Sequence, residues 1–300
     1  QFSILLKEAL GTLREGGWVE IRSDRPNLVS FSLLGNYGLT RMDGCEIGAA
    51  VSTRLVLPEV AGGGSNSTSL FVVNPNHEPV SVMFRWMGSS SLPLTKTTTL
   101  RARGSFNELF SDLFGNEYTG GYLIIEAAKP IFAVELFGSD KSQGGLLGLD
   151  ADGAASTLFG AQLAWSSSLD TTLNIINVGG SAADFTIEAI DESGKVVKSV
   201  RVPALGSGRQ YRKTARELFA LGRDLVGWVK VTATGGRLLG SLSFSDSAGN
   251  FLAALPLQSA GAREFSLSHV AETSDVFTGV TLLNATEQYA QVSVEVFDRS

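Results

Sequence analysis

The chain has 300 residues, of which 43% are hydrophobic and 18% are charged, with 34 glycines and 8 prolines. This length allows two or three domains, and the composition excludes a disordered or collagen-like chain. The 24 basic and 30 acidic residues give a net charge of −6 without any lysine–arginine block, which argues against nucleic acid or an anionic membrane as a partner. No apolar run approaches the roughly 20 residues that span a bilayer, so we expect no membrane insertion.

Residues 1–52 predict a short helix, two strands and a hairpin. The helix begins near Ser3 and lacks the glutamate of a capping box, so its N-terminus is expected to be weakly capped. A strand follows the glycine–aromatic pair Gly17-Trp18, and a second strand precedes a hairpin tip at residues 35–38. Glycine and asparagine at this tip supply the positive φ angles that a hairpin needs.

Residues 53–155 predict additional strands before the same elements recur. One strand ends at Asn74, whose side chain can close an Asx-turn. Apolar residues at alternate positions then indicate a strand with one buried face; they are Val82, Phe84 and Trp86. A capping box at Ser105–Glu108 predicts a short helix, and a hairpin tip is expected at residues 138–140.

The rest of the chain continues this order. A second capping box, Thr214–Glu217, predicts another short helix, and residues 246–249 have the composition of a hairpin tip. The last alternating apolar stripe consists of Val292, Val294 and Val296. These valines predict a further strand with one buried face.

Two sets of residues establish an internal repeat with a period near 105 residues. The strand-ending asparagines, spaced by 103 and 107 residues, are Asn74, Asn177 and Asn284. The glycine–aromatic pairs, spaced by 104 and 106 residues, begin at Gly17, Gly121 and Gly227. Their aromatic residues keep one position in every copy, so we interpret them as packing anchors rather than a sugar-stacking platform; they are Trp18, Tyr122 and Trp228.

The repeat predicts an all-β fold of tandem sandwich modules, immunoglobulin-like or fibronectin-III-like, with about seven strands and one short helix each. Residues 53–155 and 156–261 form complete modules. Residues 1–52 correspond to the C-terminal part of a module, and residues 262–300 to the N-terminal strands of another. Three alternatives remain: the chain is an excised window of a longer array, its partial modules pair with each other, or they pair between chains as a head-to-tail fibre.

Few residues suggest a site. Trp165 has no aromatic counterpart in the other copies and lies in a predicted loop, so it is the candidate for ligand contact, against the simpler interpretation of interdomain packing. Asp150 and Asp152 are spaced like the start of a calcium loop, but the later ligands are missing. His77 and His269 lack zinc-site partners, and nucleophile elbows and phosphate loops are absent. We expect neither a cofactor nor an enzyme.

Three recurring motifs carry a family resemblance. They are the strand end Asn74-Pro75, the Glu-Leu-Phe helix at residues 108–110 and 217–219, and the hairpin sequence Leu136-Phe137-Gly138. In these motifs the chain resembles tandem modules of bacterial extracellular and cell-surface proteins of unassigned function. The third copy departs at the hairpin, where Phe244-Ser245 replaces Phe137-Gly138. The resemblance implies a bacterial extracellular or cell-surface location and brings no catalytic residues.

These observations predict a non-catalytic structural or adhesive protein, acting as a stalk, spacer or fibre subunit. Its partners would be neighbouring modules, copies of itself, or surface glycans and proteins. The alternative is a carbohydrate- or protein-binding accessory region of a larger secreted enzyme, for which Trp165 is the single supporting residue. The only cysteine, Cys45, excludes an internal disulfide and leaves the compartment open.

Overall fold

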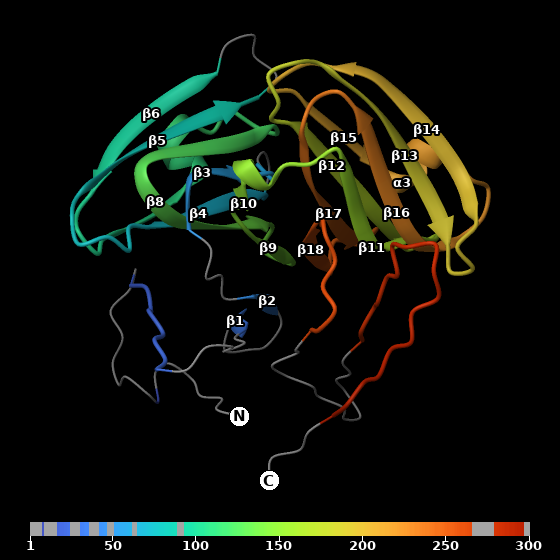
Figure 1. Cartoon of the computed structure of the whole chain (residues 1–300). Helices are drawn as coiled ribbons and strands as arrows, with labels where there is room; N and C mark the ends of the chain where they lie inside the picture. Colours follow the sequence, from blue (N-terminus) through green and yellow to red (C-terminus); the bar gives the residue numbers. More distant parts are fainter. Residues whose placement is uncertain are drawn as a thin grey trace.

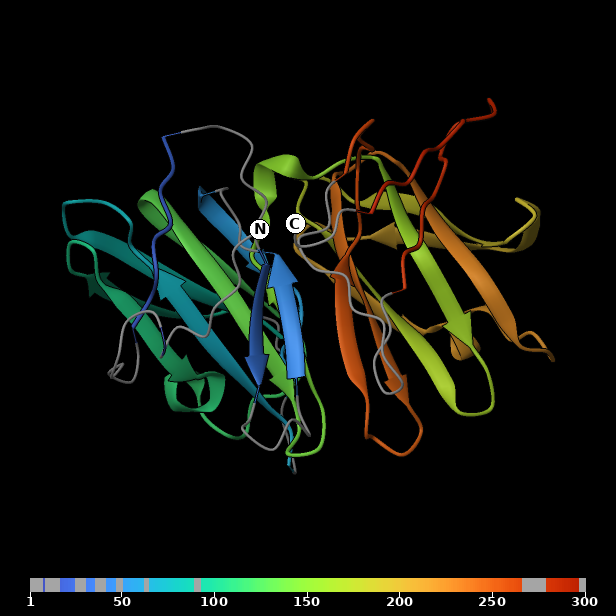
Figure 2. The same cartoon turned by 90° about the horizontal axis from the view of Figure 1, so that it is seen from below.

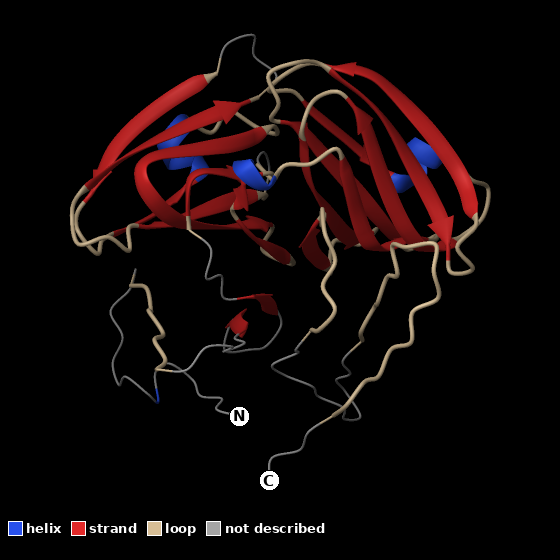
Figure 3. Ribbon diagram, in the orientation of Figure 1, coloured by secondary structure: helices blue, strands red, loops and turns tan. Residues whose placement is uncertain are grey.

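Figure 1 presents a computed structural model of the chain. The structure describes residue 8 and residues 17–24, 31–35, 42–46, 51–61, 65–88, 93–265 and 279–296. In these residues the fold is all-β, with antiparallel sheets and a few single-turn helices (Figure 3). None of the described helices is long and apolar enough to cross a bilayer.

The first group of elements, which we call the first unit, lies on the left of Figure 1. It consists of β3 (Ser52–Leu57), β4 (Ser67–Val73), β5 (Val80–Met87), β6 (Leu94–Leu100), β7 (Ser105–Leu109), α2 (Phe110–Phe114), β8 (Tyr122–Gly138), β9 (Gln143–Leu147), β10 (Leu149–Asp150) and the 3₁₀ helix η1 (Ala151–Gly153).

The second unit follows directly and lies on the right of Figure 1. It consists of β11 (Thr157–Trp165), β12 (Leu169–Asn177), β13 (Ala183–Asp191), β14 (Val196–Leu205), β15 (Gln210–Thr214), α3 (Ala215–Phe219), β16 (Leu225–Thr234), β17 (Leu238–Asp246) and β18 (Leu252–Pro256).

Both units pair their strands in the same order. The first half of β8 pairs with β3 and β5, giving β10-β3-β8-β5-β6, and its second half pairs with β4 and β9, giving β7-β4-β8-β9. The second unit has the orders β11-β16-β13-β14 and β15-β12-β17-β18. Here the counterpart of β8 is divided into β16 and β17 by Gly235 and Gly236, whose φ angles of 74° and 70° favour glycine.

Each unit has its own hydrophobic core, which takes side chains from both of its strand groups. The alternating residues of β5 are buried as the sequence predicted: Val82 and Phe84 are 0% exposed and Trp86 is 2% exposed. The Trp86 indole also donates to the Gly120 carbonyl at 2.9 Å, which satisfies its one polar atom. Period-2 patterning therefore identified the buried face of this strand correctly.

The helix N-termini agree with the sequence prediction in one unit only. Thr214 and Glu217 form the expected reciprocal capping box at α3. In the first unit the predicted Ser105–Glu108 box is wrong, because these residues belong to strand β7 and the helix begins at Phe110. Its N-cap residue, Leu109, has no side chain that can accept a hydrogen bond from the first turn.

The two hairpins at the ends of the complete units are confirmed. β8 and β9 are connected through Gly138, with φ 140°, and β17 and β18 through a turn containing Gly249, with φ 71°. Near the N-terminus, β1 (Phe31–Gly35) and β2 (Met42–Glu46) pair as the arms of the first predicted hairpin. The tip of this hairpin and the predicted helix at Ser3 lie outside the described residues.

Three predicted strands are absent from the described parts of the chain. Residues 17–24 and 279–296 contain no strand, although the sequence predicted one after Gly17, one ending at Asn284 and one at the last valine stripe. Val294 and Val296 are 73% and 74% exposed. The physical reason is that a strand is stabilised by pairing with another strand and by burial of one face, and no strand of the described residues pairs with these segments.

Candidate functional site: the junction between the two units

The two units meet along an apolar contact that is separate from both cores. Its buried residues come from β3, β8, η1 and the C-cap of η1 in the first unit and from β12 and β17 of the second; they are Val56, Tyr122, Ile124, Ala151, Ala154, Ile176 and Leu239. The units lie side by side in both Figure 1 and Figure 2. The contact therefore belongs to the fold of this chain and fixes how one unit sits on the next.

Tyr122 is the central polar contact of this apolar junction. Its ring is 0% exposed, and its hydroxyl donates across the junction to the Gly208 carbonyl at 2.8 Å. Burial raises the pKa of Tyr122 to about 12, so the phenol remains a proton donor. Gly208 has a φ of 68°, a backbone conformation that residues with a side chain rarely adopt, and the direction of its carbonyl depends on it. The packing role predicted for Tyr122 is thus extended to joining two units.

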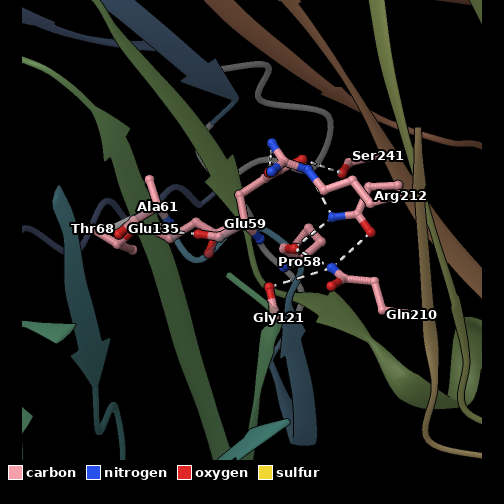
Figure 4. A network of polar contacts seen from close by, with 10 residues as sticks. Pro58, Glu59, Ala61, Thr68, Gly121, Glu135, Gln210, Arg212 and Ser241 are labelled. Atoms are coloured by element: carbon pink, nitrogen blue, oxygen red, sulfur yellow. Dashed lines mark hydrogen bonds and ion pairs between the residues drawn. The ribbon is translucent and has the colours of Figure 1, made fainter. Parts of the chain in front are cut away.

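A polar network centred on Glu59 lies beside this apolar contact (Figure 4). Glu59 follows β3 in the first unit and is only 3% exposed. Arg212 of β15 approaches its Oε2 atom at 3.0 Å, and Asn174 of β12 and Ser241 of β17 each donate to Oε1 at 3.3 Å. All three of these groups come from the second unit. One buried carboxylate of the first unit is therefore held by the second.

The Pro58 carbonyl extends the network. It accepts hydrogen bonds from the side-chain amides of Asn174 and Gln210, the latter at 3.1 Å. Gln210 also donates to the Asn174 side-chain oxygen at 2.8 Å and to the Gly121 carbonyl at 3.3 Å. These amides satisfy the carbonyl of the buried Pro58, whereas the Gly121 carbonyl also accepts the Val60 backbone N–H at 3.4 Å.

A second carboxyl group, Glu135 of β8, lies within the network and is 0% exposed. Its Oε1 atom accepts the backbone N–H of Glu59 at 3.0 Å, whereas its Oε2 atom has no hydrogen-bond partner among the described residues. Burial, together with the negative charge of Glu59, raises the pKa of Glu135 well above its ordinary value. Burial also raises the pKa of Glu59, but the Arg212 charge and the hydrogen bonds from Asn174 and Ser241 oppose that effect.

Burial thus favours the protonated form of both carboxyl groups, and the Arg212 charge opposes that effect at Glu59. Two carboxyl groups whose environments differ in this way are also found in sites of general acid–base catalysis. A substrate could not reach these carboxyl groups, because neither side chain is more than 3% exposed. The charge of Glu59 is already neutralised by Arg212. This geometry suits a fixed joint between the units better than a catalytic centre.

Sequence reasoning did not single out this network. Its one signal was Glu135, a carboxylate inside the otherwise apolar run Ala133-Val134-Glu135-Leu136-Phe137. At the matching position the second unit has Leu242, because Glu135 lies opposite Leu70 and Leu242 lies opposite Leu173, four residues before Asn74 and Asn177 respectively. The partners of a buried charge that come from another unit cannot be found by pattern alone.

Trp165, the candidate for ligand contact, lies in the core. It is the last residue of β11 rather than a loop residue, and it is 3% exposed. Its ring stacks on Phe219 with centroids 5.8 Å apart, and its indole donates to the Arg223 carbonyl at 3.1 Å. All of these contacts lie within the second unit, so the ring faces neither solvent nor the junction.

The calcium candidates have a local structural role. Asp150 is the N-cap of η1: its carboxylate accepts the Asp152 backbone N–H at 3.1 Å and the Ser52 hydroxyl at 2.9 Å. In the described part of the chain no three histidine, cysteine or acidic side chains gather as metal ligands would. His77 is exposed, Cys45 lies in β2, and His269 is outside the described residues.

The recurring asparagines have the predicted turn geometry. Asn74 and Asn177 are 0% exposed, and their side-chain oxygens accept the backbone N–H groups of Asn76 and Gly179 at 2.9 and 3.0 Å. Asn284 accepts the N–H of Thr286 at 3.1 Å in the same way. Their repetition is therefore structural, as expected.

Comparison with known proteins adds little to this description. No protein-family model and no curated protein matches the chain. One solved structure, described as "Crystal Structure of Thermotoga maritima 1070", is similar at 14% sequence identity over 33% of this chain and 94% of that chain, with a TM-score of 0.29. A likeness of this extent supports no conclusion about fold or function.

Proposed function

We propose that this chain is a non-catalytic structural or adhesive protein, built of tandem sandwich modules that correspond to residues 53–155 and 156–261. The observation that carries the proposal is the junction network. The buried Glu59 carboxylate of the first unit is held by Arg212 of the second, and Glu135 accepts the Glu59 backbone N–H. A stalk or spacer needs such a joint, because its function is to hold modules at a fixed orientation.

We further infer that the modules are variants of the immunoglobulin-like sandwich. In support, the second strand of each unit pairs with the fifth and the third with the sixth, as in that fold. The first and seventh strands differ: here they pair with the sixth and the second, respectively. The variant would therefore exchange its two outer strands between the sheets.

A location at the bacterial cell surface or in the extracellular space is part of the proposal. Its support is the motif resemblance to modules of such proteins. Labelling of intact cells with an antibody against residues 53–261 tests it: we expect labelling without permeabilisation, and labelling only after permeabilisation would contradict the proposed location.

Single-molecule force spectroscopy tests the structural role. With the chain held at its two ends, we expect two principal unfolding events, each releasing about 35 nm, which is the extended length of about 100 residues. Unfolding of the units without a measurable force peak would contradict a stalk or spacer that resists force. Turnover of a glycan or peptide substrate by the purified chain would contradict the absence of catalysis.

A further inference from the structure

The junction between the two complete units is partly repeated at both ends of the described chain. In the complete junction, the Tyr122 hydroxyl donates to the Gly208 carbonyl. At the N-terminal side, the Trp18 indole donates to the Arg103 carbonyl at 3.0 Å. Trp18 and Tyr122 hold the same position of the repeat, and Arg103 shares the positive φ of Gly208, 55° against 68°. Residues 17–24 therefore contact the first unit as the first unit contacts the second.

The contact also has further support at the N-terminal side. The Arg103 guanidinium lies 4.7 Å from the centre of the Trp18 ring and forms an ion pair with Glu20. Hydrogen bonds from Arg103 and Arg22 lower the pKa of Glu20 to about 2, so this pair remains charged.

A second junction contact recurs at the C-terminal side. In the complete junction, the Asn174 side chain donates to Glu59 Oε1 at 3.3 Å. At the C-terminal side, the Thr281 hydroxyl donates to Gln162 Oε1 at 3.2 Å. Thr281 precedes Asn284 by three residues as Asn174 precedes Asn177, and Gln162 precedes Ala164 by two residues as Glu59 precedes Ala61. Residues 279–284 thus contact the second unit as the second unit contacts the first.

The two terminal segments expose the residues that complete units bury. Val19 and Ile21 are 45% and 58% exposed, whereas their counterparts in the two complete units, Leu123, Ile125, Val229 and Val231, are all 0% exposed. Val294 and Val296 are 73% and 74% exposed, whereas the residues at their positions, Phe84, Trp86, Ile187 and Ala189, are at most 2% exposed. In the part of the chain that the structure describes, neither apolar stripe has an opposing strand or sheet.

Both complete units give the same register for joining these stripes. Phe84 lies opposite Ile125 and Trp86 opposite Leu123 in the first unit; Ile187 lies opposite Val231 and Ala189 opposite Val229 in the second. If the terminal segments paired in the register of either unit, Val294 would lie opposite Ile21 and Val296 opposite Val19. Two independent strand pairs thus specify one arrangement, with apolar side chains on the same face.

Gly17 supports this arrangement. In the complete units a side chain at the matching glycine is impossible, because a Cβ atom on Gly121 would lie 2.4 Å from the Met87 carbonyl oxygen and one on Gly227 would lie 2.0 Å from that of Ile190. Those carbonyls belong to the third strand or its end, the element that residues 292–296 represent. A Cβ atom on Gly17 meets nothing within 4 Å. The clash of a Cβ atom at this position therefore arises when the third strand is beside it.

We propose that residues 19–23 and 292–296 of the same chain pair as antiparallel strands of a third sandwich unit, which closes the three units into a ring. Both segments lie beneath the two complete units in Figure 1, and Figure 2, seen from below, places them in front of the first and second units. Repeated head-to-tail junctions close into a ring when their rotation permits. Because the two terminal segments belong to one chain, the effective concentration of each for the other is in about the millimolar range. This favours pairing within the chain over pairing with a second copy.

A paired-cysteine experiment tests the register and the partner together. In a Cys45→Ser background of the full chain, Ile21→Cys and Val294→Cys would face each other, whereas Ile21→Cys and Glu295→Cys, shifted by one residue, would lie on opposite faces. We expect about tenfold more intrachain disulfide in the first pair, since a disulfide needs Cα atoms roughly 4.4–6.8 Å apart. Disulfide-linked dimers and ladders would overturn pairing within one chain, and equal yields would overturn the register.

A glycine variant provides an independent readout. Gly17→Ala, added to the first cysteine pair, is expected to lower the intrachain disulfide yield severalfold, because its Cβ would meet the paired strand as at Gly121 and Gly227. Gly180→Ala is the matched control, since a Cβ there also meets nothing within 4 Å. An unchanged yield with Gly17→Ala would overturn the arrangement. The inference rests on the proposed function only in treating the chain as repeated sandwich units, and its failure would leave the force and surface-labelling tests unaffected.

Discussion

At the scale of single residues, the most unusual feature is a buried carboxyl group, Glu135, at the position where the second unit has the core residue Leu242. Glu135 has one hydrogen-bonded oxygen and one oxygen without a partner among the described residues, and it lies next to the charged Glu59. Burial of such a group costs stability unless it is neutral. The protonation of Glu135 therefore connects the stability of the junction to pH.

We predict that Glu135→Gln makes stability less dependent on pH. Because the folded-state pKa of Glu135 is raised well above 4.5, the folded chain keeps a proton that the unfolded chain releases. The free energy of unfolding of the natural chain should therefore fall as pH rises from about 4.5 towards the raised pKa. Glutamine carries no such titrating proton, so Glu135→Gln should be more stable than the natural chain at pH 7, where part of that free energy has been lost.

Urea unfolding at several pH values between 4.5 and 8 measures this difference. Glu192→Gln is the control, because it removes one acidic group from an exposed turn. A pH slope in Glu135→Gln equal to that of the natural chain would show that Glu135 is not the titrating group. Some slope is expected to remain, since the pKa of Glu59 is also raised.

A second residue-scale prediction concerns Arg212. Its removal leaves the Glu59 carboxylate buried with hydrogen bonds but without a counter-charge. Breaking a fully buried ion pair costs about 3–5 kcal/mol. Arg212 is 49% exposed, so we expect Arg212→Ala to lower the free energy of unfolding by about 2 kcal/mol, below that range.

The matched variant is Arg201→Ala, which breaks an ion pair with Asp184 whose side chains are 73% and 41% exposed. Exposed pairs contribute at most about 1 kcal/mol, so this variant should change stability little. Equal effects of the two substitutions in denaturant titrations would contradict the importance of the buried carboxylate.

At the scale of elements, the two short helices differ in how they begin. Strand β7 and helix α2 match β15 and α3 in order, so Asp112-Leu113-Phe114 occupies the place of Glu217-Leu218-Phe219. The sequence prediction matched Glu108-Leu109-Phe110 to Glu217-Leu218-Phe219, which is four residues too early in the chain. The apolar anchor of the helix, Phe114 or Phe219, decides the true register because it must reach the core.

Substitutions at the two N-cap positions should have opposite effects. Thr214→Ala removes the side chain that accepts the Glu217 N–H at 3.1 Å and should cost about 1 kcal/mol. Leu109→Thr supplies the missing acceptor three residues before Asp112 and should stabilise by about 0.5–1 kcal/mol. Thermal melts followed by circular dichroism measure both; the same sign for the two variants would contradict the assigned helix starts.

At the scale of the whole molecule, the junction makes the two complete units depend on each other. Apolar side chains and the Glu59 network are buried only while the units are in contact. Because losing one unit would expose the joint of the other, we expect a single transition in calorimetry, with equal calorimetric and van't Hoff enthalpies.

The double variant Asn174→Ala/Gln210→Ala should uncouple the units. It removes the amides that satisfy the Pro58 and Gly121 carbonyls, with a loss of about 1 kcal/mol for each buried hydrogen bond. We expect the transition to broaden or divide into two, whereas Lys198→Ala, on the exposed strand β14, should leave it unchanged. A single unchanged transition in the double variant would mean that the apolar contact alone couples the units.

The sequence by itself determined the repeat, the β class, the turn role of Asn74 and Asn177 and the buried stripe of β5. These features depend on residues near one another in the chain, such as the alternation of Val82, Phe84 and Trp86, so local patterns carry them. Such a pattern indicates which residues can be buried, but not whether an opposing surface is present. The exposed Val294 and Val296 have the same pattern as β5 without its surroundings.

Only the tertiary structure decided the strand order, the core position of Trp165 and the Glu59 network. Each of these depends on contacts between residues distant in the chain, such as Glu59 with Arg212, and their separation leaves no periodic signal. The charge of Glu135 inside an apolar run was visible in the sequence. Its protonation could not be predicted, because the pKa of a carboxyl group depends on burial and neighbouring charge, which folding alone supplies.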